Sequence, residues 1–374
     1  MRVLLIARYL QMVNHRKVMA LAAAPGLELW HLAPRQWTDG LRTYHQELSS
    51  GQGYHLIISH TLLHHDIHRF IYWPLSLHLG IIKPDIIHIE EEPDSLAVLQ
   101  TVVARRLWAP SAKLVLFTWQ NIRRARSFAV ERLARIVLQG VDHAIAGNCE
   151  AGDVLRQQGY AGPVSILPQL GVDTTTFKPV HGGSRRHTLG LDGPVIGYVG
   201  RFVPEKGLDV LVRAVAPLTN TRLLLIGRGP SQTDIEALAR SLGMADRMVI
   251  VPGVPHDEVA EHLNCMDVFV LPSLTTPRWK EQFGHVLIEA MACGVPVVGS
   301  SSGAIPEVIA DAGLTFPEGD ADALQAQLER LLNDREYRGG LARRARQRVL
   351  TEYSHEVIAR KTVAIYHDVI DSAA

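Results

Sequence analysis

The sequence predicts an α/β fold built from two doubly wound, parallel-sheet domains that face each other across a cleft. Three observations carry this prediction. The 374 residues exceed the roughly 100–200 residues of one ordinary domain. Short apolar runs alternate with longer amphipathic stretches, which is the pattern of a parallel sheet covered by helices on both faces. A glycine-rich, basic stretch interrupts this alternation near the middle of the chain.

In the first half, six short runs of apolar and β-branched residues predict strands. The first run is only about five residues long before Arg8, which is too short for the hydrophobic region of a signal peptide and indicates a buried strand. The amphipathic stretch Ser127–Gln139 predicts a helix between two later strands. The predicted strands are Val3–Ala7, Leu56–Ser59, Ile86–Ile89, Leu114–Thr118, His143–Ala146 and Val164–Leu167.

The stretch Lys178–Gly193 has little apolar content and predicts a linker, after which the alternation starts again. Residues 321–370 have helical spacing throughout. The second set of predicted strands is Val195–Gly200, Arg222–Ile226, Met248–Val251, Val268–Pro272, Val295–Gly299 and Gly313–Phe316.

We therefore expect an N-terminal Rossmann-like domain over 1–178, a linker over 179–193 and a C-terminal Rossmann-like domain over 194–355. A last helix, 356–374, is expected to pack back on the N-terminal domain. Ligands of such folds bind at the carboxyl ends of the strands, here in the cleft between the domains.

Composition excludes several classes of protein. The formal net charge is zero, from 38 basic and 38 acidic side chains, so a broad nucleic-acid-binding face is not expected. The halves differ, because residues 1–180 carry 18 basic against 14 acidic side chains and the rest of the chain carries 20 against 24. Three widely spaced cysteines predict a reducing compartment, and no uncharged stretch reaches the ~18 residues of a membrane span.

The segment Gly197–Gly207 (GYVGRFVPEKG) carries the first candidate site. Arg201 and Lys206 follow a strand that ends at Gly200, and a helix is expected from about Leu208. Two cations beside glycines at the carboxyl end of a strand suit a diphosphate. Lysine is scarce in this chain, with 7 lysines against 31 arginines, which favours a specific role for Lys206. The alternative interpretation is a solvated turn beside a helix.

The segment Glu281–Gly294 (EQFGHVLIEAMACG) carries the second candidate site. Glu281 and Glu289 are eight residues apart, just over two helical turns. If the helix starts near His285, the amides of residues 283–286 form an anion site at its N-terminus. Glu289 stands in an apolar run, where a carboxylate is either hydrogen-bonded or costly. The alternative is one loop glutamate and one partly exposed helix glutamate.

Together these motifs resemble the retaining nucleotide-sugar glycosyltransferases of glycosyltransferase family 4 (glycosyl transferases group 1), which have the two-domain GT-B fold. The resemblance covers the C-terminal half throughout and the N-terminal half loosely. Further matching segments are Gly171–Asp173 with Phe177 and Pro179, Gly227–Pro230, Val251–Glu258, Leu271–Ser273, Ala292–Val298 and Gly303–Glu307.

The resemblance implies a role for each motif residue. Arg201 and Lys206 would bind the diphosphate and stabilise the negative charge that grows on it as the sugar leaves. Glu281 would accept hydrogen bonds from donor-sugar hydroxyls, and Glu289 from the ribose. The remaining donor-binding residues implied are Gly200, Arg228, Val254, Phe283, Gly284, His285 and Val286.

The implied reaction is transfer of a sugar from a nucleoside-diphosphate sugar to a hydroxyl of a glycan, lipid or small molecule, with retention of anomeric configuration. The acceptor would attack from the leaving-group face with the departing phosphate as base, so no protein nucleophile is needed. The two carboxylates would bind opposite ends of the donor, whereas a glycosidase brackets the scissile bond with both. No Asp-x-Asp motif stands at the matching position, and no metal or other cofactor is expected.

The N-terminal half departs from the family at two places. The first loop, Arg8–Lys17, has no glycine, although many members have a glycine pair there. Gln120 stands where many members have a histidine near the donor sugar, and an amide can hydrogen-bond a hydroxyl but cannot titrate. The residues expected on the acceptor or sugar side are Gln120, Asn121, Glu92 and His15.

Three further clusters have two interpretations each. Residues 90–94 (EEEPD) either line the acceptor or donor site or form a solvated acidic loop. His64 and His68 share one face if their segment is helical, which would suit a metal, but 18 histidines make chance clusters common. The arginine-rich stretch Ile122–Gln139 either packs on the sheet with solvated arginines, which we favour, or contacts an anionic lipid or acceptor.

Two alternatives to transfer stay open: a nucleotide-sugar epimerase on the same architecture, and a non-catalytic nucleotide-sugar-binding subunit, the latter suggested by Gln120 and the first loop. The expected location is the cytoplasm, with peripheral contact of the N-terminal domain on the inner face of the membrane. Besides the donor and acceptor no nucleic-acid partner is expected.

Overall fold

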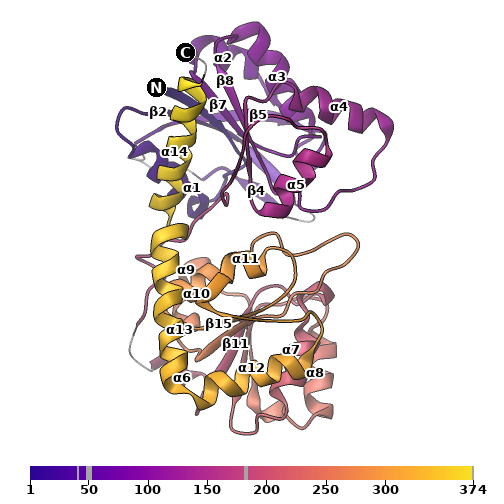
Figure 1. Ribbon diagram of the computed structural model, residues 1–374, viewed down its shortest axis with the longest axis vertical. Helices are drawn as coiled ribbons and strands as arrows, with labels where there is room; N and C mark the ends of the chain where they lie inside the picture. The colour runs from indigo at the N-terminus through magenta and orange to yellow at the C-terminus, as the bar shows by residue number, and fades with distance from the viewer. Residues whose placement is uncertain (40–41, 48–52, 181–183, 373–374) are drawn as a thin grey trace. The chain divides into compact units, whose positions relative to one another are not determined.

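In the computed structural model, the chain forms two compact units (Figure 1). The structure describes residues 1–39, 42–47, 53–180 and 184–372. Unit 1 comprises Met1–Gly171 together with His355–Ala374, and unit 2 is the continuous stretch Val172–Ser354. The chain therefore leaves unit 1 after Gly171 and returns to it at His355. The expected linker, 179–193, lies within unit 2 and contains the short helix α6 (Ser184–Thr188).

Unit 1 is built on an eight-stranded sheet with the order β10-β9-β8-β7-β1-β2-β5-β6. Neighbouring strands are parallel except β5 and β6, which are antiparallel. Strands β3 and β4 form a separate antiparallel pair, and they lie between β2 and β5 along the chain. The strands are β1 (Arg2–Ile6), β2 (Glu28–Pro34), β3 (Gln36–Asp39), β4 (Arg42–His45), β5 (His55–Leu62), β6 (Ile71–Trp73), β7 (Ile86–Glu90), β8 (Lys113–Thr118), β9 (His143–Ala146) and β10 (Val164–Ile166).

The central strands of unit 1 are buried on both faces, as their continuous apolar runs require. Val3 of β1 pairs in register with Leu29 on one side and Ile86 on the other, and all three are buried. Ser95 and Asn148 cap two of the helices by accepting from the amides of Val98 and Ala151. The helices are α1 (Met12–Ala22), α2 (Leu75–Ile82), α3 (Leu96–Trp108), α4 (Phe128–Leu138), α5 (Cys149–Gln157) and α14 (His355–Asp371).

The last helix, α14, belongs to unit 1. It runs beside α1 (Figure 1), and its buried residues join the core formed by one face of the sheet. Tyr366 is fully buried, and its hydroxyl lies 2.7 Å from Nδ1 of His88 on β7. A helix that follows all of unit 2 in the sequence therefore completes the core of unit 1.

Unit 2 is built on a six-stranded, entirely parallel sheet with the order β13-β12-β11-β14-β15-β16. The order reverses direction at β11 and β14, so the carboxyl ends of these two strands flank a topological switch point, where open α/β sheets bind ligands. The strands are β11 (Val195–Val199), β12 (Arg222–Ile226), β13 (Met248–Val251), β14 (Val268–Leu271), β15 (Val297–Ser300) and β16 (Leu314–Phe316).

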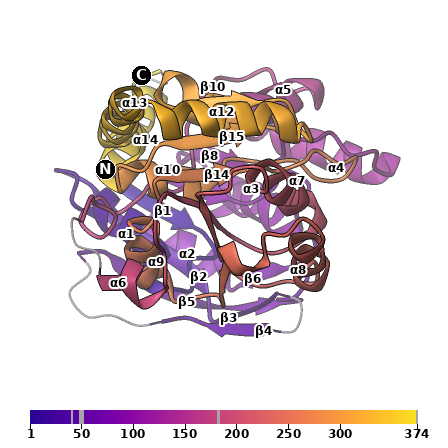
Figure 2. The ribbon, with the colours of Figure 1, turned by 90° about the horizontal axis from the view of Figure 1, so that it is seen from below.

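Helices cover this sheet, and α12 packs on α7 and beside β15 and β16 (Figure 2). Asp320 and Asp334 cap the two long helices α12 and α13 by accepting from the amides of Ala323 and Tyr337, each at 2.8 Å. The helices are α7 (Leu208–Val215), α8 (Gln232–Ser241), α9 (His256–Leu263), α10 (His285–Ala292), α11 (Ile305–Ile309), α12 (Ala321–Asn333) and α13 (Arg335–Arg348). The short turns are 3₁₀ segments at Pro204–Lys206, Ala245–Arg247 and Ala310–Ala312, and a π-helical turn at Val349–Tyr353.

The predicted fold class is confirmed, and most predicted strands agree with the structure within one or two residues; β5 is longer, beginning at His55 and ending at Leu62. Two strands of the large sheet were missed. β2 contains Glu28, Trp30 and His31, which break the apolar run, although His31 is fully buried. β6 has three residues. The helical placement of His64 and His68 is wrong, because the chain there forms turns. Spacing of four residues fits such a turn as well as a helix.

Candidate functional site

The candidate donor site lies in unit 2, where the loop after β11 meets the loop after β12. Three glycines allow these backbones to touch. A Cβ on Gly227 would lie 1.9 Å from the carbonyl oxygen of Gly200, and one on Gly229 would lie 2.2 Å from that of Phe202. The amide of Phe202 donates to the carbonyl of Arg228 at 3.0 Å. Arg201 and Arg228 thus occupy adjacent loops, and both side chains are exposed.

Lys206 and Glu281 are in direct contact, although 75 residues separate them. Nζ of Lys206 lies 2.5 Å from Oε2 of Glu281, and Oγ of Ser273 donates to the same oxygen at 2.8 Å. Lys206 also lies over the ring of Trp279, 4.7 Å from its centroid. A cation and a hydroxyl therefore hold the buried Glu281 carboxylate in one orientation.

Backbone contacts fix both partners. Gly207, with φ of 60°, begins α7, and a Cβ there would lie 2.1 Å from the carbonyl oxygen of Pro272. The amide of Leu274 donates to the carbonyl of Glu205 at 2.8 Å, which ties the loop of Lys206 to the loop after β14. The carbonyl of Glu281 accepts from the amide of Ala304 at 3.0 Å.

Helix α10 begins at His285 directly after this cluster. Gly284 precedes it with φ of 79° and provides no side-chain cap, so the first amides of the helix, from His285 and Val286 onward, point out of its N-terminus. Phe283 is buried, and burial lowers the pKa of His285. The N-terminus of α10 thus adds positive potential near the Lys206–Glu281 pair.

Glu289 lies in the second turn of α10 and pairs with a residue outside the predicted set. Its Oε1 is 2.9 Å from Nε2 of His256, the first residue of α9. The hydrogen bond to Glu289 raises the pKa of His256, although burial opposes the shift. Val254, two residues before His256, lies between β13 and α9. Glu289 remains partly exposed, with 14% of its side chain accessible.

Sequence reasoning assigned no role to three contributors in unit 2, Ser273, Trp279 and His256, although Ser273 and His256 lie in segments that resemble the family. Ser273 is two residues after the end of a buried strand, and a hydroxyl near the carboxyl end of a strand was an available signal. His256 begins a helix and could have been noticed as a cation near a carboxylate, but its pairing with Glu289 spans 33 residues. Nothing in the local sequence indicates that Trp279 lies against Lys206.

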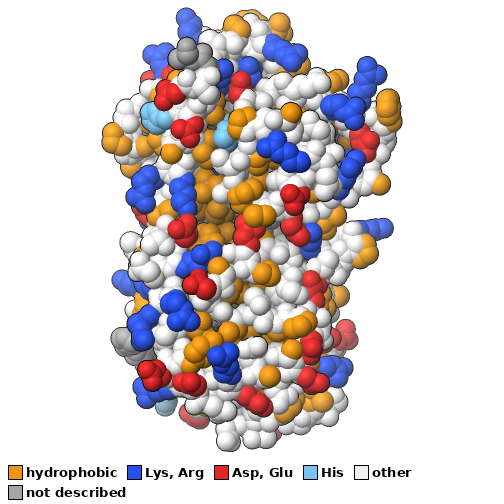
Figure 3. All heavy atoms as spheres, in the orientation of Figure 1, with side chains coloured by type: hydrophobic (Ala, Val, Ile, Leu, Met, Phe, Trp, Pro, Cys, Tyr) orange, Lys and Arg blue, Asp and Glu red, His pale blue; other side chains and the backbone are white. Residues whose placement is uncertain are grey.

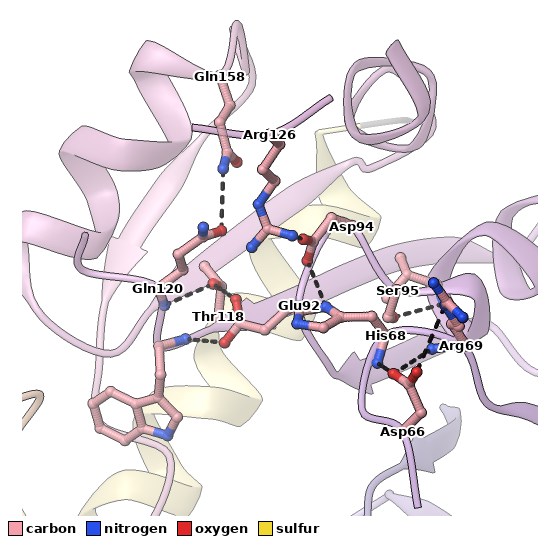
Figure 4. Close-up of polar contacts among 12 residues, drawn as sticks. Asp66, His68, Arg69, Glu92, Asp94, Ser95, Thr118, Gln120, Arg126 and Gln158 are labelled. Carbon is pink, nitrogen blue, oxygen red and sulfur yellow. Dashed lines mark hydrogen bonds and ion pairs between the residues drawn. The ribbon is translucent and has the colours of Figure 1, made fainter. Parts of the chain in front are cut away.

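In unit 1, Glu92 and Gln120 lie at the carboxyl ends of β7 and β8 (Figure 4). Glu92 accepts from the Thr118 hydroxyl at 2.5 Å and from the Trp119 amide at 3.1 Å. Burial raises the pKa of Glu92 against these hydrogen bonds. The Gln120 amide group accepts from Nε2 of Gln158 at 3.1 Å.

Asn121 and His15 differ in surroundings. Asn121 is 5% exposed and donates to Glu150, in the first turn of α5, at 3.3 Å. His15 is fully buried on α1, with Nδ1 at 2.5 Å from the Tyr54 hydroxyl and Nε2 at 2.9 Å from the carbonyl of Tyr9. Protein groups therefore occupy both ring nitrogens of His15, and the structure gives it core contacts.

The acidic segment 90–94 is not a solvated loop. Glu90, Glu91 and Asp94 are each at most 6% exposed. Arg8 donates to Glu91 at 2.7 Å, yet burial is the larger effect and raises the pKa of Glu91 to about 7. Asp94 pairs with Arg126, and Nδ1 of His68 lies 3.4 Å from it. The solvated interpretation is therefore wrong, because each of these carboxylates has a cationic neighbour inside the protein.

A second buried network was missed. Glu90 pairs with Lys17, accepts from the Tyr9 hydroxyl, and accepts from Nε2 of Gln169 at 3.0 Å. Burial opposes ionisation of Glu90, but Lys17 and its hydrogen bonds hold the pKa of Glu90 below its usual value. The polar residues His88 and Glu90 alternate in a strand buried on both faces, which was the available signal.

Two general findings bear on cofactors and membranes. In the described part of the chain, no three His, Cys, Asp or Glu side chains are grouped so as to hold a metal ion. The histidines near residue 64 are not such a group: His64 lies 3.3 Å from Nε2 of Gln36, and His68 faces Asp94. Within the same described residues, every helix falls short of the length and apolar character needed to cross a bilayer.

Comparison with known proteins agrees with the observed fold. Two units in one chain, each built on a mainly parallel sheet, have the GT-B class of glycosyltransferase fold. Residues 184–348 match the family model Glycosyl transferases group 1. Over these residues, which are fewer than half of the chain, the protein is similar to the glycosyl transferases group 1 family.

Solved structures share the fold over nearly the whole chain. Sucrose-phosphate synthase from Thermosynechococcus elongatus has a TM-score of 0.75 at 22% identity, with 99% of each chain covered. Anabaena HepE in complex with UDP has a TM-score of 0.77 at 17% identity and covers 98% of this chain and 100% of its own.

Curated relatives match over a shorter region. A GDP-mannose-dependent alpha-(1-6)-phosphatidylinositol monomannoside mannosyltransferase of Mycolicibacterium smegmatis is 37% identical over 187 residues, 46% of this chain and 49% of that relative. A D-inositol 3-phosphate glycosyltransferase of Mycobacteroides abscessus is 35% identical over 52% of this chain and 46% of its own length. The chain spans about half the length of the curated relatives it matches.

Proposed function

We propose that the protein transfers a sugar from a nucleoside-diphosphate sugar to a hydroxyl acceptor with retention of anomeric configuration. The observation that carries this proposal is the contact of Lys206 with Glu281, held by Ser273 beside the N-terminus of α10. This cluster joins a cation for a phosphate to a fixed carboxylate for sugar hydroxyls. The names of the relatives, which include a GDP-mannose-dependent enzyme, and the UDP complex of HepE support a nucleotide-sugar donor.

Each residue has a step in this reaction. Arg201, Lys206 and the first amides of α10 bind the diphosphate and stabilise the charge that develops as the sugar–phosphate bond breaks. Glu281 accepts from donor-sugar hydroxyls and so orients the ring. Glu289, paired with His256, accepts from the ribose hydroxyls, and the backbone near Val254 contacts the base. The leaving phosphate takes the acceptor proton, so Glu281 is a binding group and not a nucleophile.

The reaction is proposed to need no metal, because Arg201, Lys206 and the helix N-terminus supply the positive charge near the diphosphate. Transfer measured in the presence of EDTA should equal transfer in its absence. A loss of activity that Mg²⁺ or Mn²⁺ restores would contradict this part of the proposal.

A peripheral membrane contact of unit 1 is also proposed. Fifteen of the eighteen large apolar side chains that are exposed in the described residues belong to unit 1. They include Trp73, Leu77 and Ile81 around α2 and Leu107 and Trp108 at the end of α3. Apolar side chains with nearby arginines favour an anionic membrane surface, which for this enzyme would be the cytoplasmic face. Vesicle sedimentation of the wild type and of Leu107→Glu tests this contact.

The donor experiment is a thermal-shift panel of UDP, GDP and ADP and their hexose derivatives. We expect one nucleoside diphosphate to raise the melting temperature by several degrees at millimolar concentration, and Lys206→Ala to abolish this shift. Absence of any shift across the panel would contradict the proposal. NMR of the donor incubated alone distinguishes transfer from epimerisation, since only an epimerase changes the sugar configuration without an acceptor.

A further inference from the structure

Four arginines line a pocket in unit 1 that has no part in donor binding as described above. The pocket lies where the β8–α4 segment and α4, from Glu131 to Arg135, meet the end of α5. Its lining includes Arg123, Arg124, Arg126 and Arg135 together with Asp94 and Gln158. Figure 3 shows Lys and Arg side chains gathered over this part of unit 1.

Half of the positive charge in the pocket has no carboxylate of the lining to balance it. Arg126 is neutralised by Asp94, whose side chain is 1% exposed (Figure 4). Glu131, in the first turn of α4, is the second carboxylate of the lining. The four guanidinium groups therefore meet two carboxylates. Among the described residues, the guanidinium groups of Arg123 and Arg135 have no hydrogen-bond or ion-pair partner.

Like charges gathered in one concave site repel one another unless an anion joins them. Arginine forks match the oxygens of a phosphate, which accepts several charge-assisted hydrogen bonds at once. Two guanidinium groups without a protein partner, those of Arg123 and Arg135, suit a phosphate ester better than a neutral sugar. The chemistry of the lining thus favours a phosphorylated ligand.

One residue of the pocket lining is hydrogen-bonded to Gln120. Gln158 belongs to the lining, and its Nε2 donates to Oε1 of Gln120 at 3.1 Å (Figure 4). The buried Oε1 of Gln158 and the buried Nε2 of Gln120 have no hydrogen-bond partner within the described residues. A hydroxyl can donate to the first atom and accept from the second. The pair is therefore suited to hold a hydroxyl of a ligand whose charged group lies among the arginines.

We infer that this arginine pocket binds a phosphate ester carried by the acceptor, so that the acceptor's hydroxyls lie beside Gln120 and Gln158. The inference rests on the proposed function, because it assigns the class of acceptor for that reaction. The ester belongs either to a soluble phosphorylated polyol or to the headgroup of a phospholipid. These two sources share the same phosphate chemistry and are separated by experiment.

The test measures binding to the full chain saturated with the nucleoside diphosphate that gives the largest thermal shift, which fills the donor site. The soluble probes are glycerol 3-phosphate and, as the uncharged control, glycerol. The membrane probes are vesicles of phosphatidylglycerol and of phosphatidylcholine. The pocket variant is Arg123→Ala/Arg135→Ala. The matched control is Arg106→Ala/Arg132→Ala, which removes two exposed arginines of α3 and α4 outside the pocket.

We expect glycerol 3-phosphate to bind at least about tenfold more tightly than glycerol, the pocket variant to lose about tenfold, and the control to stay within about twofold. Competition of glycerol 3-phosphate with phosphatidylglycerol vesicles supports a lipid source, and binding of the soluble ester alone supports a polyol phosphate. Equal losses in both variants, or no preference for the ester over glycerol, would overturn the inference. If no nucleoside diphosphate raises the melting temperature of the wild type, the proposed function is overturned instead. The pocket variant should keep the same rise in melting temperature with the nucleoside diphosphate, so a loss of ester binding in that variant tests the pocket alone.

Discussion

Lys206 and Glu281 form an ion pair at 2.5 Å in which a lysine on a 3₁₀ turn meets a carboxylate that also accepts from Ser273. Both side chains are largely withdrawn from solvent, at 14% and 10% exposure. Removing one partner leaves the other charge buried, whereas removing both does not. This asymmetry allows stability and donor binding to be separated by mutation.

Lys206→Ala should lower kcat/KM about 10²–10³-fold, because it removes a preorganised cation from the leaving diphosphate. It should also reduce the free energy of unfolding by about 1–3 kcal/mol, because the Glu281 carboxylate loses its partner. Steady-state kinetics and urea titration check these values. In Lys206→Ala/Glu281→Gln the stability should return while donor binding stays lost. A double variant that regains donor binding would contradict the role assigned to Lys206.

His256→Gln should destabilise the protein more at pH 5.5 than at pH 9. The hydrogen bond to Glu289 raises the pKa of His256 above its usual value. The protonated ring therefore contributes stability that is fully present below about pH 6.5, the unfolded pKa, and is lost as the pH rises through the folded pKa. Melting temperatures at both pH values give the comparison. His187→Gln, at an exposed position on α6, serves as the control, and an equal loss at both pH values would rule out the ion pair.

Glu91→Gln should gain stability relative to the wild type as the pH rises from 5 to 8. Burial raises the pKa of Glu91 to about 7, so the folded state holds a proton that the unfolded state releases near pH 4.5. The wild type therefore loses stability between these two pKa values, by on the order of 2–3 kcal/mol, and the amide does not. Urea unfolding of both proteins at pH 5 and pH 8 measures the difference. A difference between variant and wild type that is the same at both pH values would show that Glu91 is ionised throughout.

Gly227→Ala should reduce stability by more than about 2 kcal/mol and weaken donor binding, since its Cβ would collide with the Gly200 carbonyl. The control is Gly243→Ala, where φ is also positive but no atom lies within 4 Å of the new Cβ. That variant should lose only about 1 kcal/mol from backbone strain and bind the donor normally. Equal behaviour of the two variants would mean that the contact between the loops after β11 and β12 is unimportant.

The parallel sheets, and the places in the fold of the motifs proposed to bind the donor, could be predicted from the sequence because their signals are local. The runs Met248–Val251 and Arg222–Ile226 are continuous and apolar apart from Arg222, so pattern alone locates these strands. The starts of α7 at Leu208 and α10 at His285 follow from glycines at the preceding positions. Glu281 and Glu289 were identified by their spacing around this helix start.

Ion pairs and hydrogen bonds between residues far apart in the sequence could not be predicted from local sequence pattern. Arg8 finds Glu91 after 83 residues, and Lys17 finds Glu90 after 73. The acidic segment was therefore compatible with a solvated loop until its partners were placed. β2 was missed for a related reason. His31 is fully buried, but the sequence alone does not distinguish a buried histidine from an exposed one. His15, expected on the sugar side, has core contacts that only the packing of Tyr9 and Tyr54 reveals.

The return of the chain to unit 1 has a consequence for biosynthesis. Because α14 follows Ser354, a ribosome delivers all of unit 2 before it delivers the helix that completes unit 1. Until then the apolar seat on α1 and the sheet, which Ile358, Ile365 and Tyr366 later cover, stays open to water. The nascent chain therefore exposes this apolar surface for the whole time that unit 2 is being made, which is the interval in which aggregation through unit 1 is most favoured.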